Sequence, residues 1–207
     1  MSKLSAIWQH ARKRSDVWIF STMLISASLS LIASIVLSVE AIHLAKDPDT
    51  TLGCSVNAII NCASVMKHLS ADLFGFPNSF IGMIAEPVVI TVALAGLIGV
   101  RFPRPFMAVA QVGYTAGLIF AYYLFYVSAF IIGALCPWCL LVTVSTTLVF
   151  MSLLHYNIRE NNLYLSEQTS NVLEKWIKRG GDRFLTAIIL AAMVFLVLFK
   201  YHDGLFG

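Results

Sequence analysis

Four cysteines, arranged as two close pairs, are the residues of this sequence that are best placed to carry out chemistry. Cys136 and Cys139 lie in the stretch CPWC, and Cys54 and Cys62 lie in GCSVNAIINCASVM. A thiolate can attack a neighbouring disulfide through a mixed intermediate, so two such pairs could pass electrons between them. Cysteines at these spacings can also bind a metal ion or form static disulfides. The pairs therefore leave three hypotheses open: a thiol redox relay, a four-thiolate metal site and two structural disulfides.

The composition indicates that these cysteines belong to an integral membrane protein. Of the 207 residues, 58% are hydrophobic and 12% are charged, and the mean hydropathy is +0.81. A soluble domain has about twice that charged fraction. A helix needs about 20 mostly apolar residues to cross the bilayer, and the sequence offers five such segments, at about 17–39, 79–100, 105–128, 134–155 and 184–201. We expect one all-α, polytopic membrane domain over residues 1–207, with a four-helix-bundle catalytic core and a fifth transmembrane helix.

The CPWC pair lies inside the uncharged stretch Pro105–Leu154, which is too long for one span and predicts a hairpin of two helices. Gly133 and Pro137 mark its turn. Proline is tolerated at the first position of a helix, so Cys136 should lie just before the fourth helix, where unpaired N–H groups favour a thiolate. Cys139 then lies about one turn deeper. One sulfur near water and one near lipid suit a relay from a water-soluble dithiol to a lipid-soluble acceptor.

Lysine and arginine are distributed unevenly between the connections, which predicts the orientation of the chain. Eleven lie in the amino-terminal segment, the second connection and the segment after the fourth helix, against three elsewhere, which are Lys46, Lys67 and Lys200. We expect a multi-pass protein of the cell membrane with a cytoplasmic amino terminus, a cytoplasmic segment 156–183 and an extracytoplasmic carboxy terminus. The loop 45–78 and the turn before CPWC are then outside, where disulfides persist. The net charge of +3 is a topology signal and gives no support to nucleic-acid binding.

The predicted cytoplasmic segment contains one further helix candidate. Asn171 followed by Glu174 resembles a capping box, and Gly180 with Gly181 forms a stop signal. We expect a short helix that starts at Asn171 and lies at the membrane interface.

The loop pair, taken alone, favours a structural disulfide. Seven residues separate Cys54 from Cys62, which leaves enough slack to close a disulfide and still let one sulfur move to another partner. The presence of CPWC on the same outer face shifts the interpretation towards exchange between the pairs. We therefore expect all four cysteines to belong to one redox site.

The order and spacing of the cysteines resemble the vitamin K epoxide reductase family, and its bacterial members most closely. The shared features, over about Val17–His155, are a Cys-x7-Cys loop after the first helix, Pro-Asn-Ser at the second helix and Cys-x-x-Cys at the fourth. The resemblance implies a membrane thiol oxidoreductase that oxidises a thioredoxin-like protein outside the cell and reduces a membrane quinone. In bacterial members this reaction drives disulfide bond formation.

The resemblance also implies a role for each cysteine. Cys54 would meet the external protein, Cys62 would pass electrons to Cys136, and Cys139 would face the quinone. The electron acceptor would be menaquinone or ubiquinone, and no metal is expected. Many bacterial relatives carry a thioredoxin-like domain after the fifth helix. This sequence shows none before Gly207, so we expect a separate, DsbA-like partner of thioredoxin fold.

Three further residues are expected at the quinone. Asn78 in FPNSF falls where the family has an asparagine that hydrogen-bonds a quinone carbonyl, although it could instead cap the second helix. His68 stands where the family usually has Ser or Thr, and Thr143 stands where the vertebrate enzyme has Tyr. Glu86, about a turn inside the second helix, is an ionisable group in a membrane span and so a functional candidate, although a hydrogen bond or interfacial solvation would also explain it.

Two other classes of protein stay open beside this family. A DsbB-type quinone reductase, similar by convergence, has four helices and carries Cys-x-x-Cys in its first outer loop, which is the reverse of the order found here. A non-enzymatic membrane protein with a four-cysteine metal site is the alternative outside redox chemistry. Such a site needs four thiolates that converge, whereas a relay needs cysteines that pair alternately.

Overall fold

Helices form almost the whole of the chain. The computed structural model describes the backbone of residues 3–206 and the side chains of residues 16–202. In chain order the elements are α1 (Lys3–Lys46), α2 (Cys62–Met66), the short 3₁₀-helix η1 (Leu69–Asp72), α3 (Ser79–Leu97), α4 (Arg104–Tyr126), the π-helix η2 (Val127–Ile132), α5 (Pro137–Arg159), α6 (Glu167–Lys178) and α7 (Gly181–Phe206). The described residues contain no β-strand beyond one isolated bridge. The predicted all-α fold class is confirmed.

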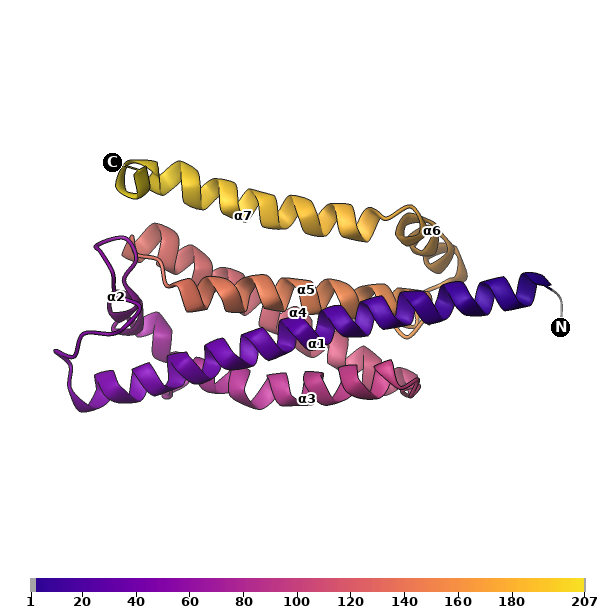
Figure 1. Cartoon of the computed structure of the whole chain (residues 1–207), viewed down its shortest axis with the longest axis horizontal. Coiled ribbons are helices and arrows are strands. Elements are labelled where there is room, and N and C mark those ends of the chain that lie inside the picture. The colour runs from indigo at the N-terminus through magenta and orange to yellow at the C-terminus, as the bar shows by residue number, and fades with distance from the viewer. Residues whose placement is uncertain (1–2, 207) are drawn as a thin grey trace.

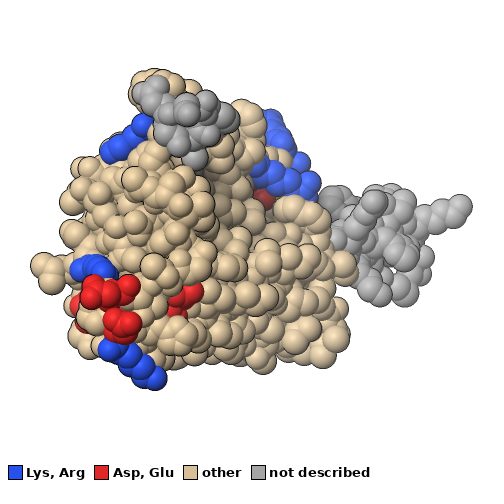
Figure 2. Space-filling model, turned by 60° about the vertical axis from the view of Figure 1, so that its left-hand side comes forward, with Lys and Arg blue, Asp and Glu red and all other residues tan. Residues whose placement is uncertain are grey.

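Five of the described helical segments are long and apolar enough to cross a membrane. They are Asp16–Lys46, Ser79–Leu97, Arg104–Ile132, Pro137–Arg159 and Gly181–His202. Many of their large apolar side chains point outward, as in Val112 and Ile119 of α4 and Phe195 of α7. Figure 2 shows a wide uncharged surface on which Lys, Arg, Asp and Glu gather in a few clusters. Such a surface suits lipid as the solvent, and the prediction of a polytopic membrane protein is confirmed.

The spans differ in extent from the segments expected from hydropathy. The first helix continues to Lys46, because its polar last turns still form backbone hydrogen bonds until the chain turns at Asp47. The third span continues through η2 and ends only where Gly133 adopts a left-handed φ of 75°. The fourth helix begins at Pro137 rather than at residue 134.

A row of small residues lets α1 and α3 pack closely. Four serines recur at every fourth position in the middle of α1, and these four are buried: Ser26, Ser30, Ser34 and Ser38. On α3 the facing residue is Gly82, where an added Cβ would overlap with the side chain of Ser34. Small residues at this spacing allow membrane helices to approach, and packing then replaces the hydrophobic effect that lipid does not provide.

The helix α5 lies in the middle of the bundle and contacts α1, α4 and α7. Buried apolar side chains from α1, α3, α4 and α5 form the main core, including Phe20, Met107 and Leu153. Figure 1 shows α7 running alongside α5, outside the group formed by α1, α3, α4 and α5. The architecture is therefore a four-helix bundle with a fifth membrane helix at its side, as the sequence predicts.

The helix α6 begins earlier than predicted. Its N-cap is Ser166, whose hydroxyl oxygen accepts a hydrogen bond of 3.4 Å from the N–H of Thr169. Asn171 lies inside the helix, so the predicted start at Asn171 was wrong. The sequence offers two capping residues here, Ser166 and Asn171. A start at Ser166 adds a turn of backbone hydrogen bonds and places Glu167 near the positive end of the helix dipole.

Candidate active site

The two cysteine pairs meet at one end of the bundle, where the long α1–α3 connection lies beside the turn between η2 and α5 (Figure 1). Backbone hydrogen bonds join these segments. The N–H of Asn61 donates to the carbonyl of Leu135 at 3.0 Å, and the N–H of Leu135 donates to the carbonyl of Ile59 at 2.6 Å. Since Asn61 precedes Cys62 and Leu135 precedes Cys136, this pairing brings two cysteines of different pairs together.

The side chain of Asn61 fixes the start of α2. Its Oδ1 atom accepts hydrogen bonds from the N–H of Ser64 at 3.0 Å and from the hydroxyl of Ser55 at 3.2 Å. Asparagine is among the best residues for this N-cap position. The helix therefore begins at Cys62, whose side chain is wholly buried.

The sulfur atoms are arranged for exchange between the pairs. Cys54 and Cys62 form a disulfide with their Cα atoms 5.7 Å apart, whereas Cys136 and Cys139 are free thiols. The sulfur of Cys62 lies 3.3 Å from that of Cys136. Cys62 and Cys136 are 0% and 1% exposed, while Cys54 is only partly buried. Cys54 is thus the member of the loop pair that an outside molecule can reach more easily.

Cys136 is the N-cap residue of α5, with Pro137 at the first helical position, as expected from the sequence. The N–H of Cys139 donates to the Cys136 sulfur at 3.4 Å. The pKa of the Cys136 thiol lies below its ordinary value, chiefly because the Cys139 thiol donates to this sulfur. The N–H groups of Cys139 and Trp138 act in the same direction, and burial opposes them. These donors favour a thiolate at Cys136.

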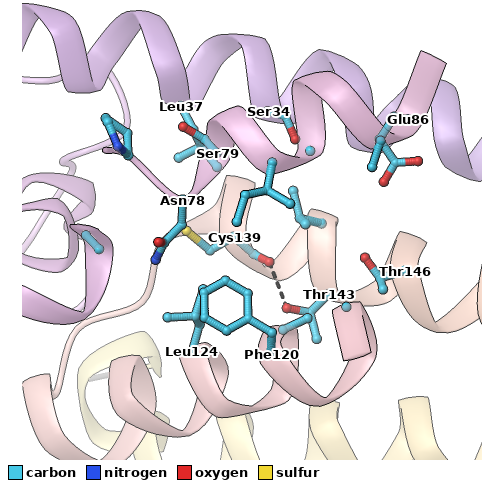
Figure 3. Close-up of a pocket in the computed structure, with 18 of the residues that line it drawn as sticks. Ser34, Leu37, Asn78, Ser79, Glu86, Phe120, Leu124, Cys139, Thr143 and Thr146 are labelled. Atoms are coloured by element: carbon cyan, nitrogen blue, oxygen red, sulfur yellow. Dashed lines mark hydrogen bonds between the residues drawn. The ribbon is translucent and has the colours of Figure 1, made fainter. Parts of the chain in front are cut away.

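A cavity of about 1120 Å³ opens beneath the cysteines, between α1, α3, α4 and α5. Most of its lining is apolar, with Leu37, Phe120 and Leu124 among the side chains drawn in Figure 3. Cys139 and Asn78 both line this cavity. An apolar cavity with few polar groups is the usual form of a site for a small organic molecule.

Asn78 lies at the start of α3, but its side chain makes no capping hydrogen bond to that helix. Its Nδ2 atom instead donates to the carbonyl of Ser70 at 2.7 Å, and its buried Oδ1 atom has no hydrogen-bond partner. The alternative role as a helix cap therefore has no support from the geometry. One N–H hydrogen and the Oδ1 atom stay free for a ligand in the cavity.

Thr143 and His68 occupy different surroundings. The buried hydroxyl of Thr143 lines the cavity and donates to the carbonyl of Cys139 at 2.9 Å (Figure 3). His68 is the N-cap of η1, where its Nδ1 atom accepts from the N–H of Ser70 at 3.2 Å. His68 is not among the residues that line the cavity, although its neighbours Lys67 and Ser70 are. The structure thus brings Asn78 and Thr143 together with Cys139, and it places His68 in the connection between α1 and α3.

Glu86 also lines the cavity, and two of its contacts were not foreseen from the sequence. The carboxylate accepts hydrogen bonds from the hydroxyl of Ser30 at 2.7 Å and from that of Tyr114 at 3.0 Å. The repeat of serines at every fourth position in the first helix could have indicated that Ser30 faces another helix. Nothing local in the sequence distinguishes Tyr114 from the other tyrosines of its helix. Among the described residues, no group of three or more His, Cys, Asp or Glu side chains is arranged to hold a metal ion.

The fold and the site define a class of protein: a multi-pass membrane protein that holds two cysteine pairs in contact above an apolar cavity. The chain belongs to the vitamin K epoxide reductase family, because the model of that family matches residues 21–154, which is more than half of its length. The matched region ends within α5 and leaves α6 and α7 outside. No curated protein matches the chain. Membership of this family makes the protein a membrane oxidoreductase.

Proposed function

We propose that the protein oxidises an extracytoplasmic, DsbA-like protein of thioredoxin fold and passes the electrons through its two cysteine pairs to a membrane quinone. The reaction supplies disulfide bonds to proteins outside the cell. The observation that carries this proposal is the 3.3 Å contact between the sulfurs of Cys62 and Cys136, next to a cavity lined by Cys139. The three sulfurs offer a continuous path from the outer loop to a lipid-soluble acceptor.

The first step of this proposal is reduction of the loop disulfide. A thiolate of the partner attacks the partly buried Cys54, which breaks the Cys54–Cys62 bond and forms a mixed disulfide. The second thiol of the partner then attacks its own sulfur in this mixed disulfide. The partner leaves oxidised, and Cys54 and Cys62 hold the two electrons as thiols.

The second step moves the electrons to CPWC. The Cys62 thiolate attacks Cys136 of an oxidised Cys136–Cys139 pair and releases Cys139. Cys54 then attacks Cys62, which restores the loop disulfide and releases Cys136. The product has an oxidised loop pair and a reduced CPWC pair, which is the connectivity that the structure contains.

The third step is reduction of the quinone. The thiols of Cys136 and Cys139 give up two electrons and two protons and form a disulfide, while the quinone becomes a quinol. The free N–H of Asn78 can donate to a quinone carbonyl, and its unpaired Oδ1 atom can accept from the hydroxyl of the quinol. Asn78 would therefore bind the acceptor both before and after its reduction.

The distribution of basic residues supports the orientation that this function needs. With the amino terminus in the cytoplasm, the end of the bundle that carries the cysteines faces the oxidising side of the cell membrane. The carboxy-terminal end of α7 lies at the same end of the bundle as α2 (Figure 1).

The proposal is tested with the protein purified in a mild detergent. On addition of a dithiol and menaquinone or ubiquinone, the quinone absorbance should fall, and Cys136→Ala and Cys139→Ala should abolish the fall. Wild-type protein that is folded and carries free thiols but leaves the quinone unchanged would contradict the proposal. Release of a bound metal on unfolding, without quinone reduction, would favour the metal-binding alternative.

A further inference from the structure

Glu86 is a buried carboxyl group on the wall of the cavity beneath Cys139. It is 5% exposed and lies in α3, within the apolar part of the bundle. Its two oxygens accept hydrogen bonds from Ser30 on α1 and from Tyr114 on α4. An ionisable side chain inside a membrane span is costly, which makes a functional role the first hypothesis for it.

The positions of Asn78 and Glu86 along α3 leave room for a para-quinone ring between the two side chains. The two residues are eight positions apart around the start of α3, a rise of about 12 Å at about 1.5 Å per residue. The ligand would form one hydrogen bond of about 2.8 Å with each residue. Subtracting both from the rise leaves about 6 Å for the separation of the two ligand oxygens. That interval is close to the distance between the two oxygens of a para-quinone ring. Figure 3 shows Asn78 and Cys139 towards one end of the cavity and Glu86 and Thr146 towards the other.

The far oxygen of such a quinone needs a proton donor of its own. Cys139 lies towards the Asn78 end of the cavity, and Cys136 precedes it at the N-cap of α5. The hydroxyl of Thr143 points its hydrogen at the carbonyl of Cys139, so it can accept but not donate a hydrogen bond. Glu86 is the acidic residue among those that line the deeper part of this cavity.

We propose that Glu86, held by Ser30 and Tyr114, binds the far oxygen of a para-quinone and gives it a proton. This inference rests on the proposed function and names its substrate class and a further catalytic residue. In its protonated form the carboxyl group can still accept the two hydroxyl hydrogen bonds and can donate its own hydrogen to a quinone oxygen in the cavity.

The proton balance of this step closes without a further reactant. Cys136 and Cys139 lose two electrons and two protons and form a disulfide. The near oxygen of the quinone takes one proton from the thiol side, and the far oxygen takes the proton of Glu86. The second thiol proton then restores the Glu86 carboxyl group as the quinol leaves.

Single-turnover kinetics with the reduced full-length protein and menadione, a para-quinone without a tail, test this inference. Glu86→Gln keeps a hydrogen-bond donor but has no acidic proton. Its half-saturating menadione concentration should stay within about twofold of wild type, while its maximal rate falls about a hundredfold or more, the low end for loss of a general acid. Glu86→Leu should also raise the half-saturating concentration several-fold. Tyr122→Phe is the matched control. It removes a 3.0 Å hydrogen bond between Tyr122 of α4 and Thr147 of α5, and neither residue lines the cavity.

Two results would overturn the role of Glu86 while leaving the proposed function intact. One is a Glu86→Gln variant whose maximal rate and half-saturating menadione concentration both equal those of wild type. The other is an equal loss of maximal rate in Glu86→Gln and Tyr122→Phe. If Glu86→Leu does not fold, the result for Glu86→Gln alone tests the inference. Glutamine has nearly the same shape as glutamate and can stay hydrogen-bonded to Ser30 and Tyr114. Wild-type protein that reduces no quinone at all would overturn the proposed function and this inference together.

Discussion

The sulfur of Cys62 lies 3.3 Å from the sulfur of Cys136, although Cys62 is already bonded to Cys54. The four cysteines allow three complete pairings, and this arrangement brings together the two sulfurs that any exchange between the pairs must join. A mixed disulfide between Cys62 and Cys136 needs only a small approach of two atoms. Backbone hydrogen bonds at Asn61 and Leu135 hold them there.

The exposure of the cysteines predicts which one an external reagent reaches. In intact reduced cells, a membrane-impermeant thiol reagent should label Cys54, because Cys62 and Cys136 are buried. Mass spectrometry of the labelled peptide identifies the residue, and Cys54→Ala should lose most of the label. Labelling that requires a permeabilised membrane would overturn the proposed orientation.

Asn61 should control transfer between the pairs through its cap on α2. Asn61→Ala removes the acceptor for Ser64 and Ser55 and should cost about 1 kcal/mol of stability. We expect slower quinone reduction with a dithiol protein as donor and little change with dithiothreitol, a small dithiol that can reach the partly buried Cys139 through the cavity and so reduce CPWC directly. Asn61→Ser retains a capping oxygen and should keep most of the protein-driven rate. Equal rates for the two variants with the protein donor would show that the cap does not position Cys62.

The lowered pKa of Cys136 should depend on Cys139. In Cys139→Ala the thiol donor to Cys136 is lost, so the pKa of Cys136 should rise towards its ordinary value and its thiolate fraction at neutral pH should fall. Ultraviolet thiolate absorbance, followed against pH with the loop disulfide intact, gives the midpoint. Cys136→Ala supplies the separate curve of Cys139 for comparison with wild type. A Cys136 midpoint that moves to lower pH in Cys139→Ala would contradict the assigned donor.

Asn78 should act on the quinone rather than on the stability of α3. Asn78→Ala should weaken apparent quinone affinity several-fold, since one hydrogen bond contributes roughly 1 kcal/mol and more when its partner stays buried. Exchange between CPWC and a dithiol should continue in this variant. Unchanged quinone kinetics together with a lower unfolding temperature would restore the helix-cap interpretation.

Local patterns in the sequence predicted much of the site. Proline at the first helical position predicted that Cys136 precedes α5, and hydropathy predicted the five spans. The contact between Cys62 and Cys136 joins residues 74 positions apart, and it depends on a backbone pairing that no local pattern encodes. Glu86 stood out as a charge in an apolar run, but its partners come from two other helices and required the packed bundle.

Separating the two electron donors tests the central claim, which is that the loop pair passes electrons from a protein to CPWC. The measurement is the rate of quinone reduction by inserted, monodisperse protein, driven either by dithiothreitol or by a reduced thioredoxin-like protein. We predict that Cys54→Ala and Cys62→Ala keep a substantial rate with dithiothreitol and lose the protein-driven rate, whereas Cys136→Ala and Cys139→Ala lose both. Oxidation of the protein donor at the wild-type rate by Cys54→Ala and Cys62→Ala would show that the loop disulfide is only structural and would contradict the relay.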